Sequence, residues 1–288
     1  MTIGQFRNDA ARLRFLRAYD TVLDRLWPGP RKAVDAPTAF GITRVYRSGS
    51  GSGSPIVLLP GAGGNSLMWH RYVPALGAHR EVITVDTIGE PGASVQQAPM
   101  RDGHDGAAWL DQLLTALDLT SAHIVGCSYG GWLALNHAID ITPDRIASLT
   151  LLDPAGFAHP GPRFYRWMIA GALAGLAPRP LRPRLARLVT NHTVLERELM
   201  SLALPAAAYR RRLPPATLFT DHDLQRLRTP AQFLLGAHSA LHDARQVADR
   251  LADRAPDALV EVVPGAGHAL PMDRPELVTD RILRFTTT

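Results

Sequence analysis

The residues that could do chemistry centre on Ser128, which lies in the pentapeptide Gly126-Cys127-Ser128-Tyr129-Gly130. This G-x-S-x-G pattern follows an apolar, strand-like run at residues 123–126 and precedes an apolar, helix-like run at 131–139. Such a strand-to-helix corner presents the serine hydroxyl at a sharp turn, and the helix N-terminus stabilises negative charge that develops beside it. We therefore predict that Ser128 is a nucleophile in acyl transfer.

A base for this serine is available near the end of the chain. His268 closes the small-residue turn Pro264-Gly265-Ala266-Gly267-His268, which follows the strand-like run 259–263. A histidine beyond the last strand of a parallel sheet reaches the same edge as a serine beyond a middle strand. We expect His268 to take the serine proton and later to protonate the leaving group.

A glycine-rich loop, Pro60-Gly61-Ala62-Gly63-Gly64, follows the strand-like run 55–59. It has neither the Walker lysine nor the G-x-G-x-x-G spacing of nucleotide-binding loops. The sequence instead predicts an oxyanion hole, in which the backbone N–H groups of Ala62 and Tyr129 converge on the developing oxyanion.

Strand-like and helix-like segments alternate along most of the chain, which indicates an α/β fold with a parallel sheet. The predicted strands are 38–47, 55–59, 81–85, 121–126, 147–152, 231–235 and 259–263, and the predicted helices outside the central region are 5–27, 104–117, 131–139, 243–254 and 275–285. We expect residues 1–157 and 229–288 to form the two parts of one core.

The rhythm changes between residues 158 and 228, where helix-like pieces at 164–176, 181–190 and 193–204 are interrupted by prolines and no strand is predicted. We expect this stretch to be a helical cap over the catalytic edge of the sheet. Its arginines are interpreted as a solvated helical face, with an acidic substrate as the alternative. Four of its apolar side chains are expected to line a pocket: Phe164, Trp167, Met168 and Leu173.

Composition narrows the possible functions. The 288 residues are 46% hydrophobic and 20% charged, which predicts a soluble globular protein with a large core. The net charge is +5, but Lys32 is the only lysine and the arginines do not alternate with aromatic residues, so nucleic-acid binding is not expected. Cys127 is the only cysteine, and His238 and His242 lack an H-E-x-x-H context, so no metal site is expected. The charged N-terminus and the lack of a long apolar run predict a cytoplasmic enzyme without membrane attachment.

Three of these motifs together resemble the α/β-hydrolase superfamily across nearly the whole chain: PGAGG at 60–64, GCSYGG at 126–131 and PGAGHALPMDRPELV at 264–278. The segments AYDTVLDRLWP, TAFGITRVY, VDTIGEPGAS and LLDPAGF further resemble a bacterial carboxylesterase branch of that superfamily. The resemblance implies an eight-stranded, mostly parallel sheet with a helical cap, no cofactor, and ester hydrolysis through an acyl-serine intermediate.

The chain departs from the family pattern at two places. Pro60 stands where the family usually has histidine, which should spare an oxyanion hole made of backbone groups. The family usually places its acid in a G-x-x-D or G-x-x-E pattern after the penultimate strand, where this chain has Ser239. Asp153, at the end of the predicted strand 147–152, and Asp243, near the start of the next helix, are the two candidate acids, and a dyad of Ser128 and His268 remains open.

The sequence therefore predicts a serine hydrolase that cleaves a small carboxylic ester or lactone. Two alternatives remain: acyl transfer, cyclisation or cleavage in a biosynthetic step at the same site, and a ligand-binding module without catalysis. The sequence does not fix the substrate or the oligomeric state.

Overall fold

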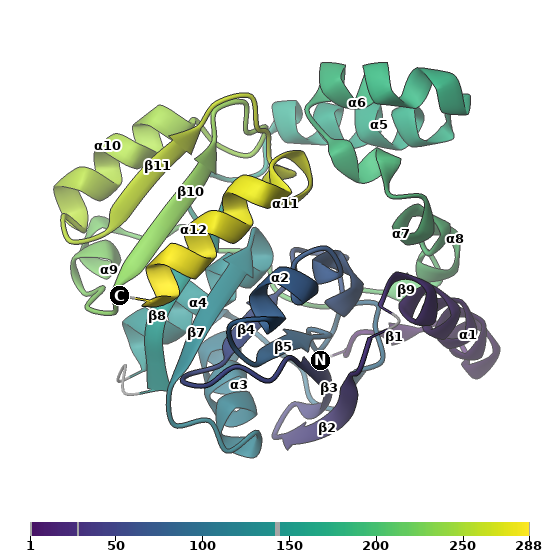
Figure 1. The fold of residues 1–288 in the computed structure, drawn as a ribbon, viewed down its shortest axis with the longest axis horizontal. Helices are drawn as coiled ribbons and strands as arrows, with labels where there is room; N and C mark the ends of the chain where they lie inside the picture. The colour runs from purple at the N-terminus through teal and green to yellow at the C-terminus, as the bar shows by residue number, and fades with distance from the viewer. Residues whose placement is uncertain (1, 28, 142–144, 288) are drawn as a thin grey trace.

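A mixed β-sheet forms the centre of the protein, seen in a computed structural model that describes residues 2–27, 29–141 and 145–287 (Figure 1). Among these residues, eight strands follow one another in the order β11-β10-β8-β7-β4-β5-β3-β2, and the short β6 pairs with β3. The strands are β2 Lys32–Thr38, β3 Gly41–Ser48, β4 Ile56–Leu59, β5 Val82–Val85, β6 Val95–Gln96, β7 Ala122–Cys127, β8 Ile146–Leu152, β10 Ala231–Gly236 and β11 Leu259–Val263.

Six neighbouring strands, from β5 to β11 in the sheet order, pair in parallel, and β3 pairs antiparallel with both β5 and β2. The central strands β4 and β5 are buried along their whole length. This burial explains why they occur in the sequence as short, uninterrupted apolar runs. The predicted α/β class with a mostly parallel sheet is confirmed.

Helices cover both faces of this sheet (Figure 1). The core on one face contains side chains of α3 (Gly103–Ala116), α4 (Tyr129–Asp140) and α10 (Ala244–Arg254). The core on the other face contains side chains of α1 (Asp9–Leu26), α2 (Val73–Gly77) and α12 (Pro275–Thr287). Two short helical turns, η1 Ser66–Trp69 and α11 Leu270–Asp273, complete the loops near the upper sheet edge.

The N-terminal segment differs from its prediction as a helix over residues 5–27. Helix α1 begins only at Asp9, because the Asn8 side chain caps it by accepting a hydrogen bond from the Ala11 N–H. The preceding β1 (Gln5–Phe6) pairs antiparallel with β9 (Tyr209–Arg210). The expectation that residues 158–228 hold no strand was therefore wrong at this two-residue pairing.

Between β8 and β10 the chain forms short helices, several of which lie at the upper right, away from the sheet (Figure 1). They are α5 Pro162–Leu176, η3 Arg179–Leu181, α6 Arg182–Val189, η4 His192–Leu195, α7 Arg197–Ser201, α8 Ala203–Ala206 and α9 Asp221–Gln225. The helix predicted over 193–204 is broken at Glu196, whose backbone leaves the helical region. Its buried carboxylate pairs with Arg71 and faces His70 of the core, which fixes the break.

Close packing at the serine corner requires glycine. A Cβ atom at Gly130 would lie 2.5 Å from the Leu59 carbonyl oxygen, and one at Gly126 would lie 2.6 Å from the Gly130 carbonyl oxygen. Backbone atoms cannot yield at such distances. The two glycines thus let β4, β7 and α4 meet at Ser128.

Replacing Gly130 with alanine should destabilise the protein by about 1–3 kcal/mol or more, because the new methyl group overlaps two carbonyl oxygens. Urea denaturation would measure the change in the free energy of unfolding. Gly161→Ala is the matched control, because its Cβ would meet no atom within 4 Å. Equal stability of the two variants would contradict the packing argument.

Candidate active site

Ser128 lies at the corner between β7 and α4, with φ of 49° and ψ of −112°. This positive φ is uncommon for a residue with a side chain and stores backbone strain. The neighbouring strand holds the corner, since the Ser128 N–H donates to the Leu152 carbonyl at 3.0 Å and the Ser128 carbonyl accepts from Ala155 at 3.0 Å. These backbone hydrogen bonds hold the strained corner in place and so fix the position of the Ser128 hydroxyl.

His268 lies in the loop that follows β11, and its imidazole joins two other predicted residues. Nε2 lies 3.0 Å from Ser128 Oγ, and Nδ1 lies 2.6 Å from Asp153 Oδ2. Because a carboxylate only accepts, Nδ1 carries the proton, which leaves Nε2 free to accept from the serine hydroxyl. The structure thus brings residues 128, 153 and 268 into one hydrogen-bonded chain.

Asp153 is fully buried at the end of β8 and is held as an anion by several donors. Gly236 N–H donates to Oδ1 at 2.9 Å, and the Ser239 hydroxyl donates to Oδ2 at 2.6 Å. Burial by itself would raise the pKa of Asp153, but nearby His242 and hydrogen bonds from His268 and Ser239 hold that pKa below its ordinary value. The carboxyl group is therefore ionised at neutral pH, as a partner of an imidazolium must be.

The other candidate acid, Asp243, occupies a different environment. It is the exposed N-cap of α10, and its Oδ1 accepts from the N–H groups of Arg245 and Gln246 at 3.0 and 3.1 Å. These bonds hold the pKa of Asp243 below its usual value. Of the two candidates, Asp153 is the one that contacts His268.

Two residues beside Asp153 belong to the site although the sequence did not predict them there. Ser239 was noted only for the carboxylate it lacks, yet it donates to Asp153. His242 was treated as a scattered histidine, but it is buried with Nε2 3.6 Å from Asp153 Oδ1, and neither ring nitrogen has a hydrogen-bond partner among the described residues. Burial lowers the pKa of His242. In the sequence, the only indication that His242 belongs to the site was its position four residues beyond His238.

The glycine-rich loop lies directly beside the serine corner. A Cβ atom at Gly61 would lie 3.4 Å from Ser128 Cβ, and Ala62 lines the same cavity as Ser128. Tyr129 follows Ser128 as the first residue of α4, where backbone N–H groups lack helical acceptors. These are the two residues expected to supply the oxyanion hole.

An ion pair between buried Glu90 and partly exposed Arg211 contacts Gly63, next to Ala62, and the ring of Tyr129, and it was not predicted. Glu90 Oε2 accepts from the Gly63 N–H at 3.1 Å, and Glu90 Oε1 accepts from Arg211 at 2.6 Å. The Arg211 guanidinium also lies over the Tyr129 ring, 4.7 Å from its centroid. Burial raises the pKa of Glu90, while Arg211 opposes that rise. A single ion pair therefore connects the glycine-rich loop 60–64 to Tyr129, the residue after Ser128.

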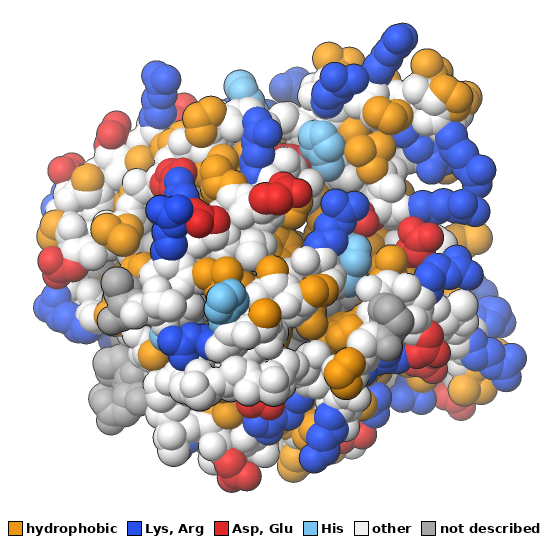
Figure 2. Space-filling view, viewed as in Figure 1, with side chains coloured by type: hydrophobic (Ala, Val, Ile, Leu, Met, Phe, Trp, Pro, Cys, Tyr) orange, Lys and Arg blue, Asp and Glu red, His pale blue; other side chains and the backbone are white. Residues whose placement is uncertain are grey.

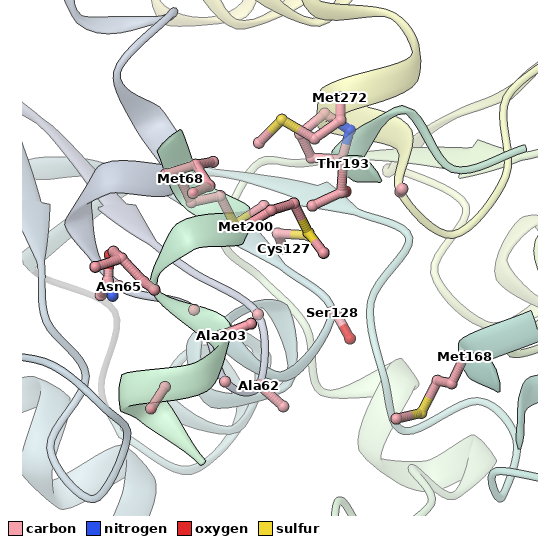
Figure 3. Close-up of a pocket in the computed structure, with 18 of the residues that line it drawn as sticks. Ala62, Asn65, Met68, Cys127, Ser128, Met168, Thr193, Met200, Ala203 and Met272 are labelled. Carbon is pink, nitrogen blue, oxygen red and sulfur yellow. The ribbon is translucent and has the colours of Figure 1, made fainter. Parts of the chain in front are cut away.

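A cavity of about 480 Å³ opens at Ser128 and His268 (Figure 3). Its walls are mostly apolar and include α1, the loop around Ala62, and several residues between β8 and β10. Phe164, Trp167 and Met168 line it as predicted, whereas Leu173 was assigned wrongly, since it points into solvent. Four methionines contribute to the wall, and their flexible side chains adapt to varied apolar shapes: Met68, Met168, Met200 and Met272.

Helix α5 covers the imidazole directly. The rings of Phe164 and Trp167 meet the His268 ring edge to face, with centroids 5.4 and 5.5 Å away. Together they leave His268 buried. Water is thereby restricted around the imidazole whose Nε2 contacts Ser128 Oγ, and the exclusion of water strengthens electrostatic interactions there.

Other chemistries find little support in the described part of the chain. No group of three His, Cys, Asp or Glu side chains there could hold a metal ion. Cys127 is buried in the wall of the cavity, and burial raises the pKa of its thiol, which makes it a poor nucleophile. None of the helices described is long and apolar enough to cross a bilayer.

The fold and the Ser-His-Asp chain at one edge of its sheet define the class, an α/β hydrolase with a serine centre. Residues 56–281 match the family described as the alpha/beta hydrolase family, and the chain belongs to that family. The resemblance of the sequence motifs to the α/β-hydrolase superfamily is thus confirmed.

Two relatives from Bacillus subtilis match along nearly their whole length. The carboxylesterase YbfK is 29% identical over 98% of this chain and 96% of its own. The crystal structure of the naproxen esterase, carboxylesterase NP, superposes with a TM-score of 0.81 at 28% identity, covering 97% of this chain and 99% of its own. The crystal structure of YbfK, also called CesB, superposes with a TM-score of 0.79. The resemblance to a bacterial carboxylesterase branch is confirmed.

If Asp153 orients His268, Asp153→Asn should lower kcat by about 10⁴-fold, because the amide favours the wrong imidazole tautomer. Asp243→Asn should leave kcat unchanged, since asparagine also caps a helix. Pre-steady-state acylation by a chromogenic ester would measure both. A large loss in Asp243→Asn would assign the acid there, and equal mild losses would favour a Ser128–His268 dyad.

Arg211→Ala should destabilise the protein by about 2–3 kcal/mol, less than for a fully buried pair because the Arg211 side chain is 35% exposed. Burial already raises the pKa of Glu90 in the folded protein, so the folded protein binds the proton of the Glu90 carboxyl more tightly than the unfolded chain does. The protein therefore loses stability as pH rises from the unfolded-state pKa of Glu90 through its folded-state pKa. Removing Arg211 raises this pKa further.

The deficit of Arg211→Ala relative to the unaltered protein should therefore be larger at pH 8 than at pH 5, as measured by urea denaturation at both pH values. Arg212→Ala, next in the chain and exposed, is the matched control. A deficit that does not change with pH would contradict the assignment to Glu90.

Proposed function

We propose that the protein is a carboxylesterase that hydrolyses small apolar esters through an acyl-serine intermediate. The observation that carries the proposal is the hydrogen-bonded chain from Ser128 through His268 to Asp153 at the floor of an apolar cavity. The Bacillus relatives named as carboxylesterases, which match over nearly the whole length, support the same activity.

In the first half of the reaction, His268 Nε2 accepts the Ser128 proton while Oγ attacks the ester carbonyl carbon. The oxyanion of the tetrahedral intermediate accepts hydrogen bonds from the N–H groups of Ala62 and Tyr129. Asp153 stays ionised and stabilises the imidazolium. Collapse of the intermediate transfers the proton from His268 to the leaving alcohol.

In the second half, a water molecule donates its proton to His268 Nε2 and attacks the acyl carbon. The same N–H groups stabilise the second oxyanion, and His268 returns the proton to Ser128 Oγ as the acid leaves. A lactone is an internal ester, so the same steps open it and retain the alcohol on the product. No step uses a cofactor.

The substrate class follows from the cavity wall. Its side chains are predominantly apolar, and its volume of about 480 Å³ suits a small organic ester. The arginines of 158–228 left an acidic substrate open as an alternative, but no arginine is among the described residues that line the cavity. We propose that residues 158–228 act as a cap between core segments 1–157 and 229–288, because α5 places Phe164 and Trp167 over His268.

The alternatives of biosynthetic acyl transfer, cyclisation or cleavage, and of binding without catalysis, have no observation in their favour. Cytoplasmic localisation and the lack of nucleic-acid partners stay predictions from the sequence.

A chromogenic short-chain ester should be hydrolysed by the protein, and Ser128→Ala should lower kcat by at least about 10⁴-fold, because it removes the attacking atom. A fluorophosphonate probe should label one serine per chain, located at Ser128 by mass spectrometry. Ser66→Ala, a buried serine outside the relay, is the control for handling and folding. Undiminished turnover in Ser128→Ala, or labelling elsewhere, would refute the proposal.

A further inference from the structure

Helix α5 presents an apolar stripe to solvent. Six apolar residues recur at intervals of three and four and are all exposed: Tyr165, Met168, Ile169, Ala172, Leu173 and Leu176. The buried residues of the helix, Gly171 and Ala174, lie on its opposite side. An amphipathic helix normally turns its apolar stripe inward, so this one is oriented for a contact outside the chain.

The helical turns next to α5 expose leucines as well. Leu176 is 82% exposed at the end of α5, and Leu188 is 81% exposed in α6, which packs against α5. Leu181 in η3 is also exposed. We name these six residues the cap-tip patch: Tyr165, Ile169, Leu173, Leu176, Leu181 and Leu188. Exposed leucines grouped in this way mark an interaction surface.

The charge around the patch has one sign. Residues 154–195 contain no aspartate or glutamate and six arginines, which are 163, 166, 179, 182, 184 and 187. Figure 2 shows apolar side chains next to arginine side chains over α5 and α6, at the upper right of the molecule. An apolar surface on a segment whose charged side chains, histidines aside, are all arginines complements a partner that is apolar inside and anionic at its surface.

The stripe also leads to the active-site cavity. Met168 is half exposed on α5 and at the same time lines the cavity, where its side chain extends toward Ser128 (Figure 3). A surface seated on the stripe would therefore lie at the entrance of the cavity.

We propose that the cap-tip patch binds the surface of an anionic lipid bilayer, with the leucines inserted at the level of the headgroups and the arginines paired with lipid phosphates. A second copy of this chain is disfavoured as the occupant, because two such positive surfaces repel each other. The sequence predicts no membrane attachment and a solvated arginine face, because the outward orientation of the leucines is a property of the folded chain. A bilayer in this position would supply apolar esters to Ser128, a consequence that rests on the proposed esterase activity.

Cosedimentation with vesicles tests the proposal. The full chain should sediment with vesicles of equal parts phosphatidylglycerol and phosphatidylcholine at low salt, and much less with phosphatidylcholine alone. High salt should weaken the binding, because it screens arginine–phosphate attraction. Equal binding to both vesicle types, or no binding to either, would overturn the proposal.

Two pairs of substitutions separate the two contributions. Arg184→Gln with Arg187→Gln should weaken partitioning about fivefold per arginine, and Leu173→Ser with Leu176→Ser should weaken it about tenfold or more. The matched control is Leu259→Ser with Arg228→Gln, two exposed residues outside the cap-tip patch and outside residues 154–195, which should bind like the unaltered protein. If the leucine variant fails to fold, the arginine variant and the salt dependence still decide.

Hydrolysis of a water-soluble short-chain ester without vesicles should be equal in all these proteins, since none of the changed residues lines the cavity. If the unaltered protein does not hydrolyse this ester, the esterase proposal alone is contradicted. Unchanged partitioning of both cap variants, or sedimentation as a dimer that the leucine substitutions dissociate, would overturn the membrane proposal alone.

Discussion

The buried carboxylate of Asp153 is the constraint on which the site depends. An ionised carboxylate without solvent is costly, and this one is stabilised by donors that come from separate parts of the sheet. Gly236 lies at the end of β10, Ser239 in the loop after it, and His268 in the loop after β11. The same bonds that compensate for burial therefore fix the ends of neighbouring strands, and with them the imidazole that faces Ser128.

Ser239 explains how the acid can lie on β8. The family pattern expects a carboxylate at this position, and a second carboxylate beside Asp153 would repel it. The hydroxyl instead donates to Asp153 at 2.6 Å and fills the space. The sequence could not choose between Asp153 and Asp243, because spacing along the chain does not say which strand end faces His268. That choice depends on β8 lying between β7 and β10, which is a property of the assembled sheet.

The fold was largely predictable because buried parallel strands are apolar on both faces, as in β4 and β5, and because the serine motif requires a strand before it and a helix after it. The errors fall where distant contacts override local preference. Pairing of β1 with β9 takes residues 5–6 out of the predicted helix. The helix predicted over 193–204 is broken at Glu196, which forms an ion pair with Arg71 and contacts His70. Leu173 has helical periodicity, but periodicity does not reveal which face of a helix meets the core.

Several contacts of the segment between β8 and β10 end on a residue of the site or on its neighbour. Arg211 binds Glu90, which holds Gly63 of the oxyanion loop. The backbone and ring of His192 bind one oxygen of buried Asp273, whose other oxygen accepts from the Gly267 N–H beside His268. Phe164 and Trp167 pack on His268 itself. A displacement of this segment would therefore disturb the oxyanion loop and the imidazole together, so the helices that shape the cavity also maintain the geometry of the reacting groups.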